Sequence, residues 1–357
     1  MSMDQNAAGH RDHTREHARD HARRGRRLVR ALAAAVTVLT LGACGLRAET
    51  PPPVEPSPDA VEQVRARTVA DSLALSAAAS AAAVLPDGAA EPVAPVLADV
   101  TGFSDQHADQ LGGVYVSGLP APTGSPTATA TTTASVAEVL DRLAEATRTA
   151  RTDADAVTDG PLARLVASVA TSRGELATRL ALATGAEVPV LVPDETTAEP
   201  DPTPSPSTSA AEGDSLSTAE VGVLALVHDE AGYGFEVIAA KLSGDQRAAA
   251  RSAAAAHRSR SEDWAADAGI DGSAQDPRRA SYTLPAGLDD PAVATALGRT
   301  LETAVADAYA NAVAQAPAGA RSPLVEGLRR ATVDAAVWGA TPVPFPGLPE
   351  RAQQPTG

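Results

Sequence analysis

Apolar residues recur every three or four positions along most of this chain, which is the spacing of an amphipathic α-helix. The clearest run covers residues 136–157, where the apolar positions alternate in steps of four and three. Residues 159–161, Asp-Gly-Pro, interrupt this run. A second run then covers residues 162–180 and stops before Gly185. Two helical runs joined by so short a break predict a helical hairpin.

Two further helical runs precede this hairpin. We expect the first to start at Ser57-Pro58, a capping residue followed by proline, and to reach Val84. We expect the second to cover residues 91–111 and to end at the glycine pair 112–113. Together with the hairpin, these runs predict an N-terminal helical domain over residues 58–185. This domain has enough helices to form a four-helix bundle of its own.

The region after residue 216 contains four more helical runs. Ser217 followed by Glu220 predicts a capping box at the start of the first. The connections alternate between short and long, which suits a four-helix bundle. The sequence therefore predicts an all-α fold with a C-terminal four-helix bundle over residues 216–340, whose helices cover residues 217–242, 250–264, 290–312 and 322–338.

The segments between and after these helical regions are rich in proline. Residues 44–57 are expected to form an extended tether, and residues 186–215, rich in Pro, Thr and Ser, a disordered linker. We expect residues 341–357, also proline-rich, to be a flexible tail.

The first 43 residues have the organisation of an export signal. Arginines at 23–30 precede a short apolar stretch, and the tetrapeptide Leu41-Gly42-Ala43-Cys44 closes it. Cys44 is the single cysteine of the chain and stands where a bacterial lipoprotein signal requires one. We therefore expect cleavage before Cys44 and lipidation of its thiol, which would hold the protein on the extracytoplasmic face of the cell membrane. The alternative is a secreted protein or a short membrane anchor with a coincidental cysteine.

Charge and cysteine content restrict the partners. The whole chain has a net charge of −16, and residues 1–43 carry eight arginines and four acids, so the remainder carries −20. So acidic a protein is not expected to bind nucleic acid, because binding to phosphates needs basic side chains. With one cysteine, the fold forms no intramolecular disulfide and must be held by packing.

Three segments of the C-terminal region carry a family resemblance. They are residues 230–236 (Glu-Ala-Gly-Tyr-Gly-Phe-Glu), the stretch from Arg251 to Arg258 that includes His257, and the helix from Leu324 to Trp338. Together they resemble the ferritin-like domain of unknown function found in bacterial lipoproteins of the actinobacterial type. The resemblance covers about residues 215–340. It implies a ferritin-like four-helix bundle and no established activity.

A ferritin-like bundle raises the question of a metal site. Di-metal bundles take a Glu from each of two helices and a Glu-x-x-His from each of the other two. Here Glu230, His257 and Glu302 stand at candidate positions, but Ala254 replaces one glutamate and Arg329 one histidine. The full di-metal set is therefore absent. The alternative is that His257 pairs with Glu230 or Glu302 inside the bundle and that the hydroxyls of Tyr233 and Tyr309 add further partners.

These observations support two hypotheses. The first is a non-catalytic envelope lipoprotein, without a cofactor, whose bundle interacts with another envelope protein or a small ligand. The second is a metal-binding protein or oxidoreductase that holds iron or another divalent metal through Glu230, His257 and Glu302. The sequence contains no nucleophile elbow, phosphate-binding loop or dinucleotide fingerprint.

Overall fold

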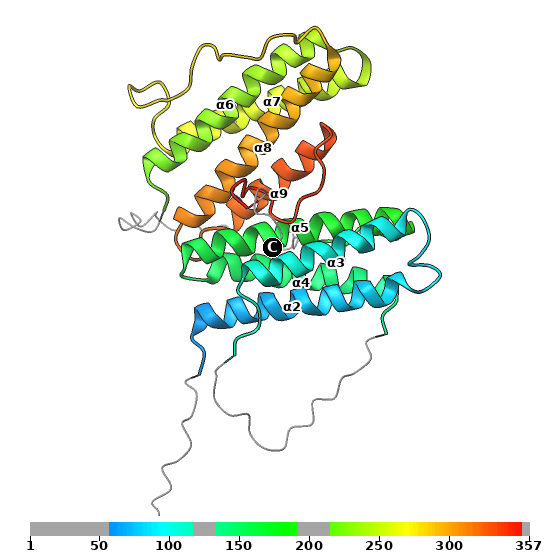
Figure 1. The fold of residues 1–357 in the computed structure, drawn as a ribbon. Coiled ribbons are helices and arrows are strands. Elements are labelled where there is room, and N and C mark those ends of the chain that lie inside the picture. Colours follow the sequence, from blue (N-terminus) through cyan, green and yellow to red (C-terminus); the bar gives the residue numbers. More distant parts are fainter. Residues whose placement is uncertain (1–56, 117–132, 192–214, 352–357) are drawn as a thin grey trace, which may run out of the picture. The chain divides into compact units, whose positions relative to one another are not determined.

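Eight α-helices and no strands make up the part of the chain that the computed structural model describes, which is residues 57–116, 133–191 and 215–351 (Figure 1). The predicted all-α fold is confirmed for these residues. Cys44, most of the tether and most of the second linker lie outside them. The helices are α2 (Ala60–Ala83), α3 (Val93–Gln110), α4 (Val136–Ala156), α5 (Gly160–Thr184), α6 (Thr218–Lys241), α7 (Gly244–Asp267), α8 (Pro291–Gln315) and α9 (Ser322–Val337).

Local capping explains where several helices begin and end. Ser217 and Glu220 form the expected capping box at the start of α6. Gly185 ends α5 with φ of 71°, in the left-handed region that favours glycine. The expected cap at Ser57 is wrong, because Asp59 accepts a hydrogen bond from the backbone N–H of Glu62 and α2 starts after it.

The first four helices pack as two pairs, α2 with α3 and α4 with α5. The pairs meet through α2 with α4 and α3 with α5, so all four sides of this bundle are closed. Its core consists largely of leucine, valine and alanine; the leucines are Leu75, Leu97, Leu143, Leu176 and Leu180. This region therefore forms the four-helix arrangement that its helix count suggested.

The second four helices are packed differently. α6 contacts both α7 and α8, and α8 contacts α9. α7 and α9 do not pack closely along each other, and α9 instead contacts α4 and α5. This bundle therefore has one open side, between α7 and α9.

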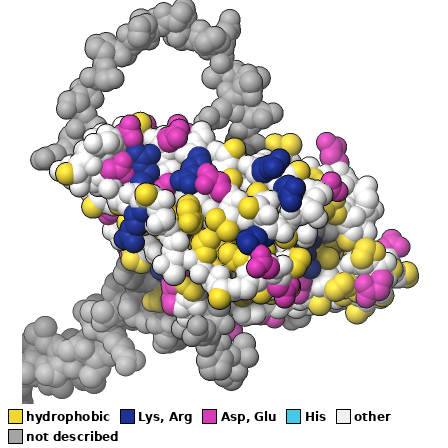
Figure 2. Space-filling model, turned by 90° about the horizontal axis from the view of Figure 1, so that it is seen from above, with side chains coloured by type: hydrophobic (Ala, Val, Ile, Leu, Met, Phe, Trp, Pro, Cys, Tyr) yellow, Lys and Arg dark blue, Asp and Glu magenta, His cyan; other side chains and the backbone are white. Residues whose placement is uncertain are grey.

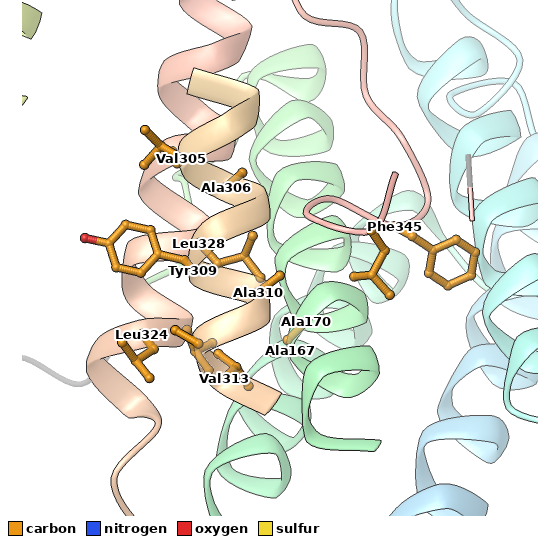
Figure 3. Packing of buried hydrophobic residues seen from close by; sticks show 14 of the residues in the cluster. Ala167, Ala170, Val305, Ala306, Tyr309, Ala310, Val313, Leu324, Leu328 and Phe345 are labelled. Atoms are coloured by element: carbon orange, nitrogen blue, oxygen red, sulfur yellow. The ribbon is translucent and has the colours of Figure 1, made fainter. Parts of the chain in front are cut away.

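Glycines allow α8 and α9 to approach closely. A Cβ on Gly327 of α9 would lie 2.4 Å from the ring of Tyr309 on α8. In the reverse direction, a Cβ on Gly298 of α8 would lie 2.8 Å from the indole of Trp338, which follows α9. Each aromatic ring thus occupies the space that a side chain on the facing helix would need. Figure 3 shows Tyr309 and Leu328 within the core that α8 and α9 share with α5.

The C-terminal segment contradicts the expected flexible tail as far as residue 351. Phe345 and Leu348 are buried, and Figure 3 shows Phe345 within the core cluster. His107 on α3 lies 2.7 Å from the carbonyl oxygen of Pro344, and Ser168 on α5 donates a hydrogen bond of 2.7 Å to that of Pro346. Prolines cannot donate backbone hydrogen bonds, but their carbonyls accept them, so this composition is compatible with a fixed path. We call residues 341–351 the C-terminal strap.

Candidate functional site

The centre of the second bundle contains a chain of hydrogen-bonded polar side chains. His257, on α7, is 5 % exposed and has partners on both ring nitrogens. Its Nε2 lies 3.0 Å from Oε1 of Glu302 on α8, and its Nδ1 lies 2.9 Å from Nδ1 of His228 on α6. The ring stacks on Phe235, with centroids 5.5 Å apart and an angle of 1° between the planes. Side chains from α6 and α8 therefore fix the position of this imidazole.

The chain continues beyond His228. Its Nε2 lies 2.9 Å from the hydroxyl of Tyr309 on α8. That hydroxyl also accepts a hydrogen bond of 3.3 Å from the indole N–H of Trp264 on α7. The chain thus runs from Trp264 through Tyr309, His228 and His257 to Glu302, in that order.

The direction of the hydrogen bonds follows from the two ends of this chain. An indole N–H can only donate, and an ionised carboxylate can only accept. With Glu302 ionised, His257 donates from Nε2. Where Nδ1 of His257 accepts, Nδ1 of His228 donates. His228 then accepts a hydrogen bond at Nε2 from the hydroxyl of Tyr309. In this arrangement every hydrogen bond points toward Glu302.

The burial of these groups supports this arrangement. Burial lowers the pKa of His228 to about 3, with further lowering by His257 and Arg260, so this imidazole is neutral at neutral pH. Burial raises the pKa of Glu302, and the hydrogen bond from His257 opposes that rise. The second carboxylate oxygen of Glu302, Oε2, is buried and has no hydrogen-bond partner.

A pocket opens above Glu302 and His257 on the side where α7 and α9 separate. Its volume is about 360 Å³. Small side chains of α7 form one wall, and Val337 and Trp338 at the end of α9 form another. Arg260, Arg330 and Asp334 complete the lining with charged groups. The pocket therefore combines apolar walls, a buried carboxylate at the bottom and charged groups around it, a combination typical of small-ligand sites.

The third residue of the predicted metal set, Glu230, lies apart from this site. Both nitrogens of His257 are already engaged, on opposite sides of the ring, by Glu302 and His228. Within the described residues, no group of three or more His, Cys, Asp or Glu side chains is arranged to hold a metal ion. The described residues therefore do not show the predicted convergence of Glu230, His257 and Glu302, whereas the alternative pairing of His257 with Glu302 is found.

The neighbouring Asp229, which sequence reasoning passed over, is the buried carboxylate on this part of α6. It accepts hydrogen bonds from the guanidinium of Arg258, from the backbone N–H of Arg279 at 3.0 Å and from the hydroxyl of Tyr282 at 2.5 Å. These contacts fix the loop between α7 and α8 against α6.

A second cavity, of about 310 Å³, lies between α5 and α9. Burial raises the pKa of Glu175 on its wall to about 7. The other lining side chains belong mainly to α5 and to the far face of α9, and none of the histidines takes part. We therefore regard the pocket between α7 and α9 as the candidate functional site.

The surface around the helices carries charges of both signs. Figure 2 shows hydrophobic side chains gathered near the middle of the face seen from above, with basic and acidic side chains around them. The acidic net charge of the chain is therefore not spread evenly over this face, and a ligand approaching it meets local positive groups as well.

Comparison with known proteins gives a family match for part of the chain. Residues 224–350 match the family described as a domain of unknown function (DUF4439). The DUF4439 match contains His228, His257, Glu302 and Tyr309, and it extends over nearly all of the C-terminal strap. No curated protein and no solved structure matches the chain. The helices in the described ranges include none long and apolar enough to cross a bilayer.

Proposed function

We propose that this protein is a lipid-anchored, extracytoplasmic binding module whose ligand site is the pocket between α7 and α9. The observation that carries this proposal is the built floor of the pocket, where Glu302 is fixed by His257 and offers an unpartnered oxygen. An unpartnered buried polar atom costs folding free energy, and a ligand that supplies a donor offsets that cost.

The hydrogen-bond partners of the buried polar side chains support binding rather than catalysis. His228 and Tyr309 use their polar atoms on one another, on His257 and on Trp264. Among the polar atoms of these side chains, Glu302 Oε2 is buried without a hydrogen-bond partner. The ferritin-like assignment of the bundle belongs to this proposal. It is supported by four helices in the expected order and by the resemblance over residues 215–340.

A pocket-filling substitution tests the location of the site. Ala253 lines the pocket on α7, so Ala253→Phe should occupy part of its volume. Ala266→Phe, at an exposed position of the same helix, is the matched control. We would measure thermal unfolding of the full chain in detergent with a panel of amino acids, amines, carboxylates and sugars.

We expect at least one compound class to raise the melting temperature of the wild-type and Ala266→Phe proteins but not of Ala253→Phe. The proposal is wrong if no compound shifts the transition, or if Ala253→Phe responds as the wild type does.

The proposed location rests on Cys44 and is tested separately. Replacing Cys44 by Ser removes the thiol that would carry the lipid, so the protein should move from the membrane fraction to the soluble fraction. Cell fractionation with detection of the protein in each fraction measures this. Continued membrane attachment of the variant would exclude a lipid anchor at this residue.

A further inference from the structure

The charges of the pocket between α7 and α9 are separated by depth. The Glu302 side chain at the bottom is 2 % exposed, and its Oε2 has no partner. The Arg330 side chain is 50 % exposed and stands at the mouth. A molecule in the pocket therefore meets a carboxylate at its inner end and a guanidinium at its outer end.

Two more charged residues belong to the lining, whereas Arg330 lies 3.9 Å from Oε1 of Glu326. Asp334 and Arg260 both border the pocket, yet neither forms an ion pair with any residue in the described ranges. Other charges close by are paired, since Arg329 bonds Glu326 at 2.6 Å. Asp334 acts electrostatically on Glu302 and His257, so it adds negative charge to the inner half of the pocket. Charges of both signs thus line the pocket.

The walls between these charges suit an aliphatic body. Ala249, Ala253 and Ala256 from α7 face the pocket together with Val337 and the indole of Trp338. A volume of about 360 Å³ is near the lower end of ligand sites, so the occupant is a small molecule. An aromatic ring beside two carboxylates also favours a cationic group, which an indole face attracts.

We propose that the pocket binds a small aliphatic zwitterion, with its ammonium group on Glu302 Oε2 and Asp334 and its anionic group at the mouth by Arg330. This inference rests on the proposed binding function and specifies its ligand class. An ammonium supplies the donor that Oε2 lacks. It also places a positive charge next to the carboxylates of Glu302 and Asp334.

Three probes of equal length test this assignment: 5-aminopentanoate, pentylamine and pentanoate. Isothermal titration of the full chain in detergent should give the tightest binding for 5-aminopentanoate, about tenfold or more tighter than for either singly charged probe. The ammonium and the carboxylate each contribute a charge-assisted contact, and each probe with one charge lacks the other.

Glu302→Gln separates the inner contact from the outer one. Glutamine keeps an oxygen that accepts from His257 but loses the charge, so affinity for 5-aminopentanoate and pentylamine should fall by about tenfold to a hundredfold. Affinity for pentanoate should not fall. Arg330→Gln should show the reverse pattern. Its affinity for 5-aminopentanoate and pentanoate should fall, and its affinity for pentylamine should not change. Glu262→Gln, at an exposed position of α7, is the control and should change none of them.

The possible failures are distinguishable. Pentanoate binding as tightly as 5-aminopentanoate, or amine binding that is indifferent to Glu302→Gln, would overturn the charge assignment. If all three probes fail but other compounds bind in a manner that Ala253→Phe abolishes, the ligand class is wrong and the binding function stands. If no compound binds, the proposed function itself fails.

Discussion

His107, on α3, is a second site where a neutral imidazole is enclosed by the protein. The side chain is fully buried, its Nε2 donates to the carbonyl of Pro344, and its ring meets that of Phe345 edge to face at 5.2 Å. Burial lowers its pKa to about 3, and Arg173 adds to the lowering. Burial therefore makes protonation of either imidazole, His107 or His228, unfavourable in the folded protein.

The lowered pKa of His107 should make the free energy of unfolding depend on pH. Between about pH 6.5 and pH 3, the unfolded chain binds a proton at residue 107 that the folded chain does not. The free energy of unfolding therefore falls as pH falls through this window, by up to about 1.4 kcal/mol per pH unit for each such histidine. His107→Gln keeps a donor for Pro344 but cannot be protonated. We expect its slope between pH 6 and pH 4 to be shallower by about this amount, measured by urea unfolding at each pH.

Buried carboxylates act in the opposite direction, so slopes must be compared between variants. Burial raises the pKa of Asp307 to about 6 and that of Glu175 to about 7. The folded state binds more protons at these groups, and stability from them declines as pH rises through those values. They are present in both proteins and cancel in the difference. An unchanged slope in His107→Gln would show that residue 107 is protonated in the folded state.

For single residues, the sequence predicted which polar side chains contact each other better than it predicted where they lie in the bundle. His257 with Glu302 follows from two polar positions on apolar helix faces, and that pairing is found. The contact of His228 with Tyr309 joins residues on α6 and α8. Helical periodicity identifies the inward face of each helix, but the relative height of two helices depends on packing between them, which periodicity does not contain.

The pairing of glycine with an aromatic ring governs the contact of α8 with α9. Gly327→Ala would place a methyl group 2.4 Å from the buried Tyr309 ring, so the helices must separate or the ring must move. We expect the free energy of unfolding to fall by about 1–3 kcal/mol, the usual cost of overpacking a core. Chemical denaturation measures this loss directly.

Gly102 on α3 provides the matched control. A Cβ there meets nothing within 4 Å. Gly102→Ala should therefore raise stability by up to about 1 kcal/mol, because alanine favours the helix. Equal effects at the two positions would mean that helix propensity, and not the contact with Tyr309, explains the result.

Elements were largely predictable because their signals are local. The capping box at Ser217 and the terminating Gly185 are read within a few residues, and both are found. The open side between α7 and α9 had no such signal. It arises because α9 packs on α4 and α5, which lie more than a hundred residues earlier in the chain.

On the scale of the whole molecule, the C-terminal strap connects the two sets of helices. Phe345 belongs to the same core cluster as residues of α5, α8 and α9, and it contacts His107 of α3. Phe345→Ala should lower the free energy of unfolding by about 3–5 kcal/mol, as for other buried phenylalanines. Hydrogen exchange should show the loss of protection in α3 and α5 as well as in α8.

Val343→Ala is the control within the same segment, since Val343 is 37 % exposed. It should change stability by less than about 1 kcal/mol. Loss of protection confined to the second bundle in Phe345→Ala would contradict the connecting role of the strap.

The strap escaped prediction because its composition is that of a linker. The prolines of the strap have no backbone N–H to donate in a helix or strand. Side chains from distant helices instead donate hydrogen bonds to backbone carbonyls of the strap. Arg164 on α5 donates to Gly347, and Ser168 one turn later donates to Pro346. Such partners come from sequence positions far away, so composition alone could not reveal them.

The position of this strap also affects how the protein is made. Ribosomes synthesise α3 and α5 before the strap, whose side chains cover them here. Until then, the early helices keep apolar surface exposed and cannot reach full stability. A product shortened by premature termination or by proteolysis before residue 345 would retain that exposed surface. Cellular proteases remove such incompletely folded chains, so the persistence of the protein depends on residues 341–351 being present.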